Sequence, residues 1–144
     1  MSRELELARL VRFFETIGAD NLHGQLMQVY ARDAKFKDPF NEVQGVNEIV
    51  RIFEHMFKQV GQPRFVVTAK VLQGPLAFLT WEFLFRMKRF SQETQCILGA
   101  THIIFDADGM VAVHRDYWDA AEELYEKLPV VGSLMRWLKR SANR

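Results

Sequence analysis

The first 60 residues place apolar side chains at the spacing of amphipathic helices. Apolar residues recur every three or four positions over residues 2–17, 21–31 and 46–60, which lines them up along one side of a helix. The segment around Asp38-Pro39 must leave helical geometry, because proline restricts its own backbone and that of the residue before it. The pattern therefore predicts three helices in the N-terminal part of the chain.

A segment rich in β-branched and aromatic residues follows Pro63 and predicts strands. The turn residues Gln73-Gly74-Pro75 and Asp108-Gly109 divide this segment into pieces of hairpin length. The predicted strands cover residues 64–72, 76–90, 95–105 and 110–118 and form an antiparallel meander. Helices followed by strands indicate an α+β domain whose three N-terminal helices pack on one face of a curved antiparallel sheet.

Residues 128–144 combine basic and apolar side chains and contain no acidic residue. They predict a basic amphipathic helical extension that is interrupted at Pro129 and Gly132, attached to a domain over residues 1–127. Such a helix is able to rest on an anionic membrane or to cover a pocket. Packing against its own domain or a partner subunit is expected instead, because one short helix binds a membrane only marginally.

Composition and charge exclude several classes of protein. A chain of 144 residues corresponds to one domain, and 19 Lys and Arg against 18 Asp and Glu leave no basic excess for binding nucleic acid. Cys96 is the single cysteine, and the N-terminus lacks the apolar segment of a secretory signal, so a cytoplasmic protein is expected. The histidines have no metal-ligand spacing and no glycine-rich nucleotide motif occurs, so no cofactor is expected.

Several local motifs make the chain resemble the nuclear transport factor 2-like superfamily. They are the segment from Tyr30 to Ala34, Asp38-Pro39, Gly45 before the third helix, and His114–Asp119 at the end of the last strand. Ketosteroid isomerases and SnoaL-like polyketide cyclases belong to this superfamily. The resemblance covers roughly residues 4–124 and implies a cone-shaped pocket, enclosed by the bent sheet and the helices, for a small apolar or polycyclic ligand.

Asp38 occupies the position at which the resemblance places the general base of ketosteroid isomerases. A carboxylate at the mouth of an apolar cavity is a stronger base than one in water, which suits it to proton abstraction. The alternative is a structural one, because Asp-Pro also begins turns at protein surfaces. The sequence leaves both roles of Asp38 open.

The oxyanion hole of an isomerase is missing from the matching positions. The resemblance places Phe14 and Thr101 at the two donor positions and Phe53 where a supporting tyrosine stands. Phenylalanine cannot donate a hydrogen bond, so ketosteroid isomerase activity itself is not expected. Tyr30 is expected either to donate to a ligand or to be a core tyrosine bonded to nearby backbone.

The last predicted strand carries the clearest candidate chemistry. His114, Asp116 and Trp118 alternate with Arg115 and Tyr117, which puts the first three on one face. A histidine and a carboxylate together can relay protons, and the resemblance implies that SnoaL-like cyclases use an aspartate near this strand's end in an aldol ring closure. The alternative is a buried polar network without a catalytic role.

The turn before this strand decides which neighbour faces His114. A loop of two or four residues puts Thr101 and Ile103 beside His114, whereas a three-residue loop with a bulge brings His102 there. The spacing shared with the isomerases favours Thr101, and His102 is kept as second choice. The expected apolar walls of the pocket are Phe14, Phe53, Trp81, Phe83, Ile103 and Trp118.

The sequence predicts an α+β domain, and the resemblance implies that it is a small-molecule-binding cone with cofactor-independent acid/base chemistry of the isomerase or cyclase type. The candidate catalytic residues are Asp38, His114 and Asp116. The alternative function is a non-catalytic binding or assembly module, which forms a homodimer through the outer face of its sheet.

Overall fold

The computed structural model describes residues 3–87, 91–123 and 131–142. Its N-terminal part holds the three expected helices, α1 (Glu4–Thr16), α2 (Leu22–Met27) and α3 (Val46–Gln59). The α2 helix is shorter than predicted, because the chain turns after Met27 and continues as strand β1 (Tyr30–Lys37). Tyr30 and Ala31 therefore belong to the sheet, and the expectation that they extend the second helix is wrong.

A six-stranded sheet forms the other layer, in the order β2-β1-β6-β5-β4-β3. The predicted meander is confirmed in its four long strands, which are β3 (Val60–Gln73), β4 (Leu76–Met87), β5 (Ser91–Phe105) and β6 (Val111–Tyr117). The pattern missed β1 and the short β2 (Glu42–Gln44). The β1–β6 pair is parallel, so the sheet is mostly but not wholly antiparallel.

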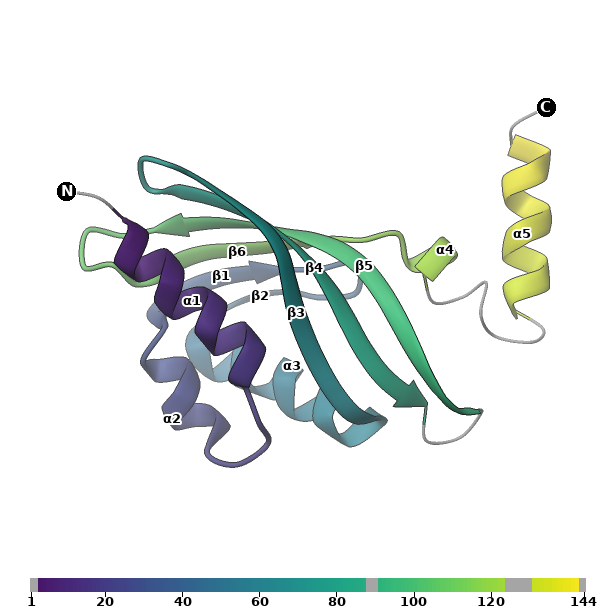
Figure 1. The fold of residues 1–144 in the computed structure, drawn as a ribbon, viewed down its shortest axis with the longest axis horizontal. Helices are drawn as coiled ribbons and strands as arrows, with labels where there is room; N and C mark the ends of the chain where they lie inside the picture. Colours follow the sequence, from purple (N-terminus) through teal and green to yellow (C-terminus); the bar gives the residue numbers. More distant parts are fainter. Residues whose placement is uncertain (1–2, 88–90, 124–130, 143–144) are drawn as a thin grey trace.

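The sheet curves over the helices, as Figure 1 shows, with α1, α2 and α3 on its concave side. Helices α1 and α3 each bury one apolar stripe, which includes Leu10 and Phe14 of α1 and Ile49 and Phe53 of α3. These side chains join the main core, while four others, at the far end of β4 and β5, form a second cluster: Trp81, Phe83, Phe85 and Ile97.

After the sheet, the chain forms the short helix α4 (Ala120–Glu123) at the end of the domain and helix α5 (Val131–Ala142) in the C-terminal extension. Gly132 lies within α5 rather than interrupting it, and Pro129 is outside the described residues. Helix α5 packs against α4 and stands apart from the sheet in Figure 1, and Trp137 is 55% exposed. Among the helices that the structure describes, none has the length and apolar character needed to cross a bilayer.

Removal of residues 128–144 should leave the stability of the cone nearly unchanged. Every main-core residue in the part of the chain that the structure describes lies upstream of this segment. We expect the thermal midpoint, followed by circular dichroism, to stay within about 2 °C of that of the full chain. A fall of more than about 5 °C would show that the extension unfolds together with the domain.

Candidate active site

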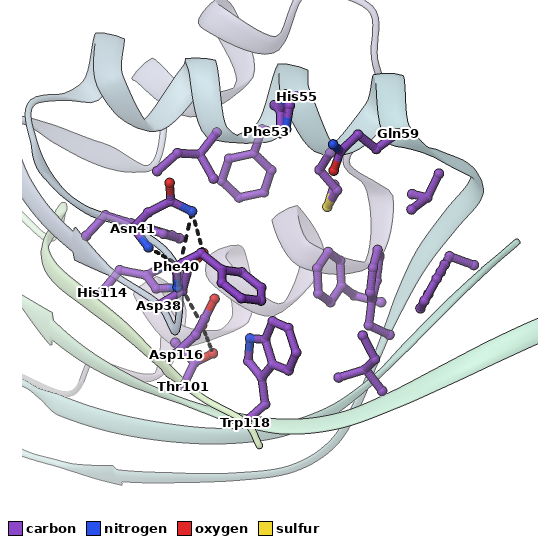
Figure 2. A pocket seen from close by; sticks show the side chains of 18 of the residues that line it. Asp38, Phe40, Asn41, Phe53, His55, Gln59, Thr101, His114, Asp116 and Trp118 are labelled. Carbon is purple, nitrogen blue, oxygen red and sulfur yellow. Dashed lines mark hydrogen bonds and ion pairs between the residues drawn. The ribbon is translucent and has the colours of Figure 1, made fainter. Parts of the chain in front are cut away.

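A cavity of about 1100 Å³ opens between the inner face of the sheet and α3 (Figure 2). This volume is large enough for a polycyclic molecule. Five of the six predicted wall residues line the cavity: Phe14, Phe53, Trp81, Phe83 and Trp118. The sixth, Ile103, is fully buried in the main core below it, so its expected place in the wall is wrong.

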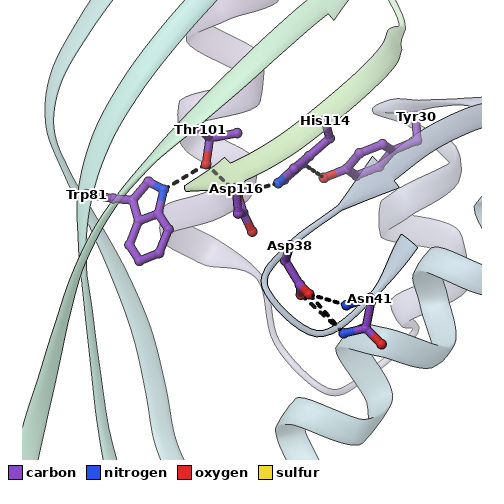
Figure 3. A network of polar contacts seen from close by, with 7 residues as sticks. All are labelled: Tyr30, Asp38, Asn41, Trp81, Thr101, His114 and Asp116. Carbon is purple, nitrogen blue, oxygen red and sulfur yellow. Dashed lines mark hydrogen bonds and ion pairs between the residues drawn. The ribbon is translucent and has the colours of Figure 1, made fainter. Parts of the chain in front are cut away.

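A chain of hydrogen bonds crosses the narrow, polar end of the cavity (Figure 3). Trp81 Nε1 donates to Thr101 Oγ1 at 2.7 Å, and Thr101 Oγ1 donates to Asp116 Oδ1 at 2.6 Å. His114 Nε2 lies 2.7 Å from the same Asp116 oxygen, and Tyr30 Oη lies 2.8 Å from His114 Nδ1. Thr101 and His114 thus meet at one carboxylate and link it to Trp81 on β4 and Tyr30 on β1.

The proton positions in this network follow from Tyr30. Its hydroxyl is buried, and its pKa is raised well above 10.0, first by burial and then by the negative charge of Asp116. Tyr30 therefore keeps its proton and donates it to His114 Nδ1. In this arrangement His114 accepts at Nδ1 and donates from Nε2 to Asp116 Oδ1.

Asp116 is bound on one side only. Its Oδ1 accepts from both Thr101 and His114, and no described residue donates to its Oδ2. The side chain is 19% exposed and lines the cavity. A carboxylate oriented through one oxygen and open to an apolar cavity through the other has the arrangement of a general base.

Asp38 also borders the cavity, but its hydrogen bonds belong to a turn. Its Oδ1 accepts from the backbone N–H groups of Phe40, at 2.8 Å, and Asn41, at 2.7 Å. The side-chain amide of Asn41 contacts both of its oxygens. The geometry matches the structural alternative, in which this aspartate shapes the loop between β1 and β2.

His102 lies on the opposite face of the sheet, which corrects its place as a second-choice pocket residue. Thr101 pairs with Asp116, whereas His102 pairs with Arg115 and stacks on Phe78 at 4.8 Å. The turn is longer than the expected two or four residues, but a bulge where β5 and β6 meet restores the register. Thr101 therefore faces the cavity, as the spacing favoured.

Sequence patterns missed several lining residues. Phe65 on β3 follows the two-residue alternation of its strand, which could have found it, and Phe85 on β4, which the alternation turns inward with Trp81 and Phe83, was left out of the predicted walls. Phe40 and Asn41 follow Pro39 in a loop, where no periodicity operates. The Phe40 ring packs edge-on against Trp118, with 5.5 Å between ring centroids, so the loop reaches the end of β6.

Comparisons with known proteins identify the family. A family model described as a SnoaL-like domain matches residues 10–114, which include Tyr30, Thr101 and His114. The chain belongs to the SnoaL-like family. No curated protein matches it at a significant level of similarity.

Solved structures agree with this SnoaL-like assignment at the level of the fold. An NTF2-like protein of unknown function from Burkholderia pseudomallei has a TM-score of 0.72 and 14% identity, covering 85% of this chain and 95% of its own. A candidate SnoaL-like polyketide cyclase from Jannaschia sp. CCS1 has a TM-score of 0.72 and 16% identity, and the match covers 83% of this chain and 88% of the cyclase. An LEH-like epoxide hydrolase from M. tuberculosis has a TM-score of 0.64 and 11% identity, and the match covers 84% of this chain and 85% of the hydrolase.

Because Gly99 has no side chain, it leaves room for the indole of Trp81 in the wall of the cavity. The two residues are paired across β4 and β5, and a Cβ atom added at Gly99 would overlap the six-membered ring of the indole. Gly99→Ala should therefore displace Trp81, break its bond to Thr101 and lower the free energy of unfolding by about 1–3 kcal/mol in a urea titration. Gly61→Ala is the matched control, because its added Cβ meets Arg86 only at an ordinary 3.7 Å. Equal stability of the two variants would contradict this packing role.

Within residues 3–87, 91–123 and 131–142, no three His, Cys, Asp or Glu side chains are grouped in a way that could hold a metal ion.

Proposed function

We propose that the cavity binds a small apolar or polycyclic carbonyl compound and that Asp116 moves a proton on it without a cofactor. The observation that carries this proposal concerns the two oxygens of Asp116 at the end of an apolar cavity: Oδ1 is held by two donors, and Oδ2 accepts no hydrogen bond from a described residue. Because the surrounding walls are largely aromatic, a flat ligand would gain apolar and stacking contacts there.

The proposed reaction begins with removal of a proton from the carbon next to the carbonyl group. Asp116 Oδ2 takes the proton, and the electron pair of the broken C–H bond moves into the carbonyl group to form an enolate. Return of the proton to another carbon gives an isomer. Attack of the enolate carbon on a second carbonyl group of the same molecule closes a ring, and protonated Asp116 then supplies the proton to the new alkoxide.

The network behind Asp116 would keep this carboxylate in one orientation through the reaction. Thr101 and His114 hold Oδ1, and Tyr30 holds His114 in the tautomer that donates to Asp116. Such a base needs no rearrangement before it reacts, which is the usual benefit of a preorganised site. His114 is thus a positioning residue for Asp116, because both of its ring nitrogens already form hydrogen bonds within the protein.

Deuterium exchange into 2-tetralone tests this function. This bicyclic ketone has acidic hydrogens between its carbonyl group and its aromatic ring, and NMR in D₂O follows their loss. We expect the wild-type protein to accelerate the exchange in proportion to its concentration. A rate equal to that of the buffer with a heat-unfolded sample would contradict the proposed function.

An assembly role is the second candidate, supported by the outer face of the sheet. Phe78, Leu98 and Tyr117 on this face are 43%, 56% and 46% exposed. A second copy of the chain would cover these side chains in a homodimer. Light scattering should then show a dimer that persists on dilution to micromolar concentration, and a monomer there would count against this role.

A further inference from the structure

Trp118 presents an indole N–H group at the polar end of the cavity. It follows β6 directly and lies two residues after Asp116, so both side chains are on the inner face of the sheet. In Figure 2 the indole nitrogen is on the side of the ring nearer to Asp116. The Trp118 and Phe40 rings pack against each other at an interplanar angle of 76°, which limits the rotation of the indole.

The Trp118 N–H group has no hydrogen-bond acceptor among the described residues, in contrast to the neighbouring donors. Trp81 donates to Thr101, and Thr101 and His114 both donate to Asp116. Tyr30 is committed to His114. Around the carboxylate, the described side chains therefore leave one acceptor, Asp116 Oδ2, and one donor, Trp118 Nε1, available to a ligand.

This pair of atoms matches the two needs of enolate formation. The reaction requires an acceptor for the proton on carbon and a donor for the negative charge that develops on the carbonyl oxygen. Thr101 cannot be that donor, because its hydroxyl proton is directed to Asp116. Phe14, at the other expected donor position, has no polar hydrogen to give.

We propose that Trp118 Nε1 holds the carbonyl oxygen of the substrate and stabilises the oxyanion while Asp116 takes the adjacent proton. This assignment rests on the function proposed above and adds the group that binds the carbonyl oxygen of its substrate. The C–H bond breaks, its proton goes to Asp116 Oδ2, and its electron pair forms the enolate. The indole keeps its own proton throughout.

The test compares Trp118→Phe with wild type in the 2-tetralone exchange assay. Phenylalanine retains an aromatic ring at this site but removes the N–H donor, so we expect kcat/KM for exchange to fall by about 10²–10³-fold. Trp118→His restores a donor and should recover part of the rate. Trp137→Phe, on the exposed side of α5, is the matched control and should exchange at the wild-type rate.

Binding of two aromatic probes separates the hydrogen bond from packing. Trp118→Phe should weaken the binding of 2-naphthol, which carries an oxygen, about tenfold and leave that of naphthalene unchanged in equilibrium dialysis. A variant that exchanges 2-tetralone at the wild-type rate, or that loses both probes equally, would overturn the role of the N–H group. Absence of exchange by the wild type would instead overturn the proposed function itself.

Discussion

Asparagine in place of Asp116 should lower the exchange of 2-tetralone hydrogens by about 10²–10⁴-fold. The amide oxygen can still accept from Thr101 and His114, as Asp116 Oδ1 does, so the side chain keeps its orientation. The amide nitrogen that replaces Oδ2 cannot take a proton from carbon. The chemistry should therefore be lost while the fold and the shape of the cavity are retained.

The control for this substitution is Asp33→Asn, which makes the same chemical change at an exposed site on β1. It should exchange 2-tetralone at the wild-type rate, and NMR in D₂O measures both variants. Thermal unfolding and naphthalene binding should show that Asp116→Asn is folded and that its cavity is open. An Asp116→Asn protein with more than about a tenth of the wild-type rate would remove Asp116 from the chemistry.

Removal of the Tyr30 hydroxyl should destabilise the domain by about 1–3 kcal/mol, because His114 Nδ1 would be buried without a donor. Urea titration of Tyr30→Phe measures this loss. Tyr117→Phe is the matched control, since Tyr117 is 46% exposed and Arg115 contacts its ring rather than its hydroxyl. Equal loss in both variants would contradict the role of the network.

The contribution of the Tyr30 hydroxyl to the free energy of unfolding should also depend on pH. Its pKa is raised in the folded state, so unfolded chains lose this proton first, at about pH 10, while the folded protein retains it. The stabilisation is therefore complete below about pH 10 and declines as the pH rises above that value. We expect the stability difference between wild type and Tyr30→Phe to narrow there, and a constant difference would contradict the raised pKa.

The sequence predicted the elements whose signals are local. Apolar spacing located α1 and α3 closely, and alternation located the four long strands of the meander. The same reasoning failed at β1, because Leu22, Leu26 and Val29 continue a helical spacing up to Tyr30. What makes Tyr30–Lys37 a strand is its parallel pairing with β6, about 80 residues away, and no local pattern reports such a contact.

The candidate site could also be predicted only where its residues follow a local pattern. Two-residue alternation placed His114, Asp116 and Trp118 together on the inner face, and this needs only the strand itself. The choice between Thr101 and His102 depended on a bulge, which the turn residues do not reveal. The bond between Tyr30 and His114 joins positions 84 residues apart, so only the folded structure shows it.

The hydrogen bonds of Asp38 favour one of the two interpretations that its motif leaves open. The Asp-Pro pair fits both a base and a turn, and the backbone donors of Phe40 and Asn41 account for its Oδ1. The sequence likewise indicated an absent oxyanion hole from Phe14 and Phe53. It did not indicate that Trp118 brings another donor to the same end of the cavity.

A crystal structure of the protein with bound 2-naphthol tests the central claim most directly, because this molecule resembles an enolate but cannot react further. We expect its rings to lie among the aromatic walls, its oxygen to be within about 2.7–3.2 Å of Trp118 Nε1, and its carbon 1, next to the carbon that bears the oxygen, to face Asp116 Oδ2. A naphthol bound outside the cavity, or one whose oxygen points to the mouth beside α3, would contradict it.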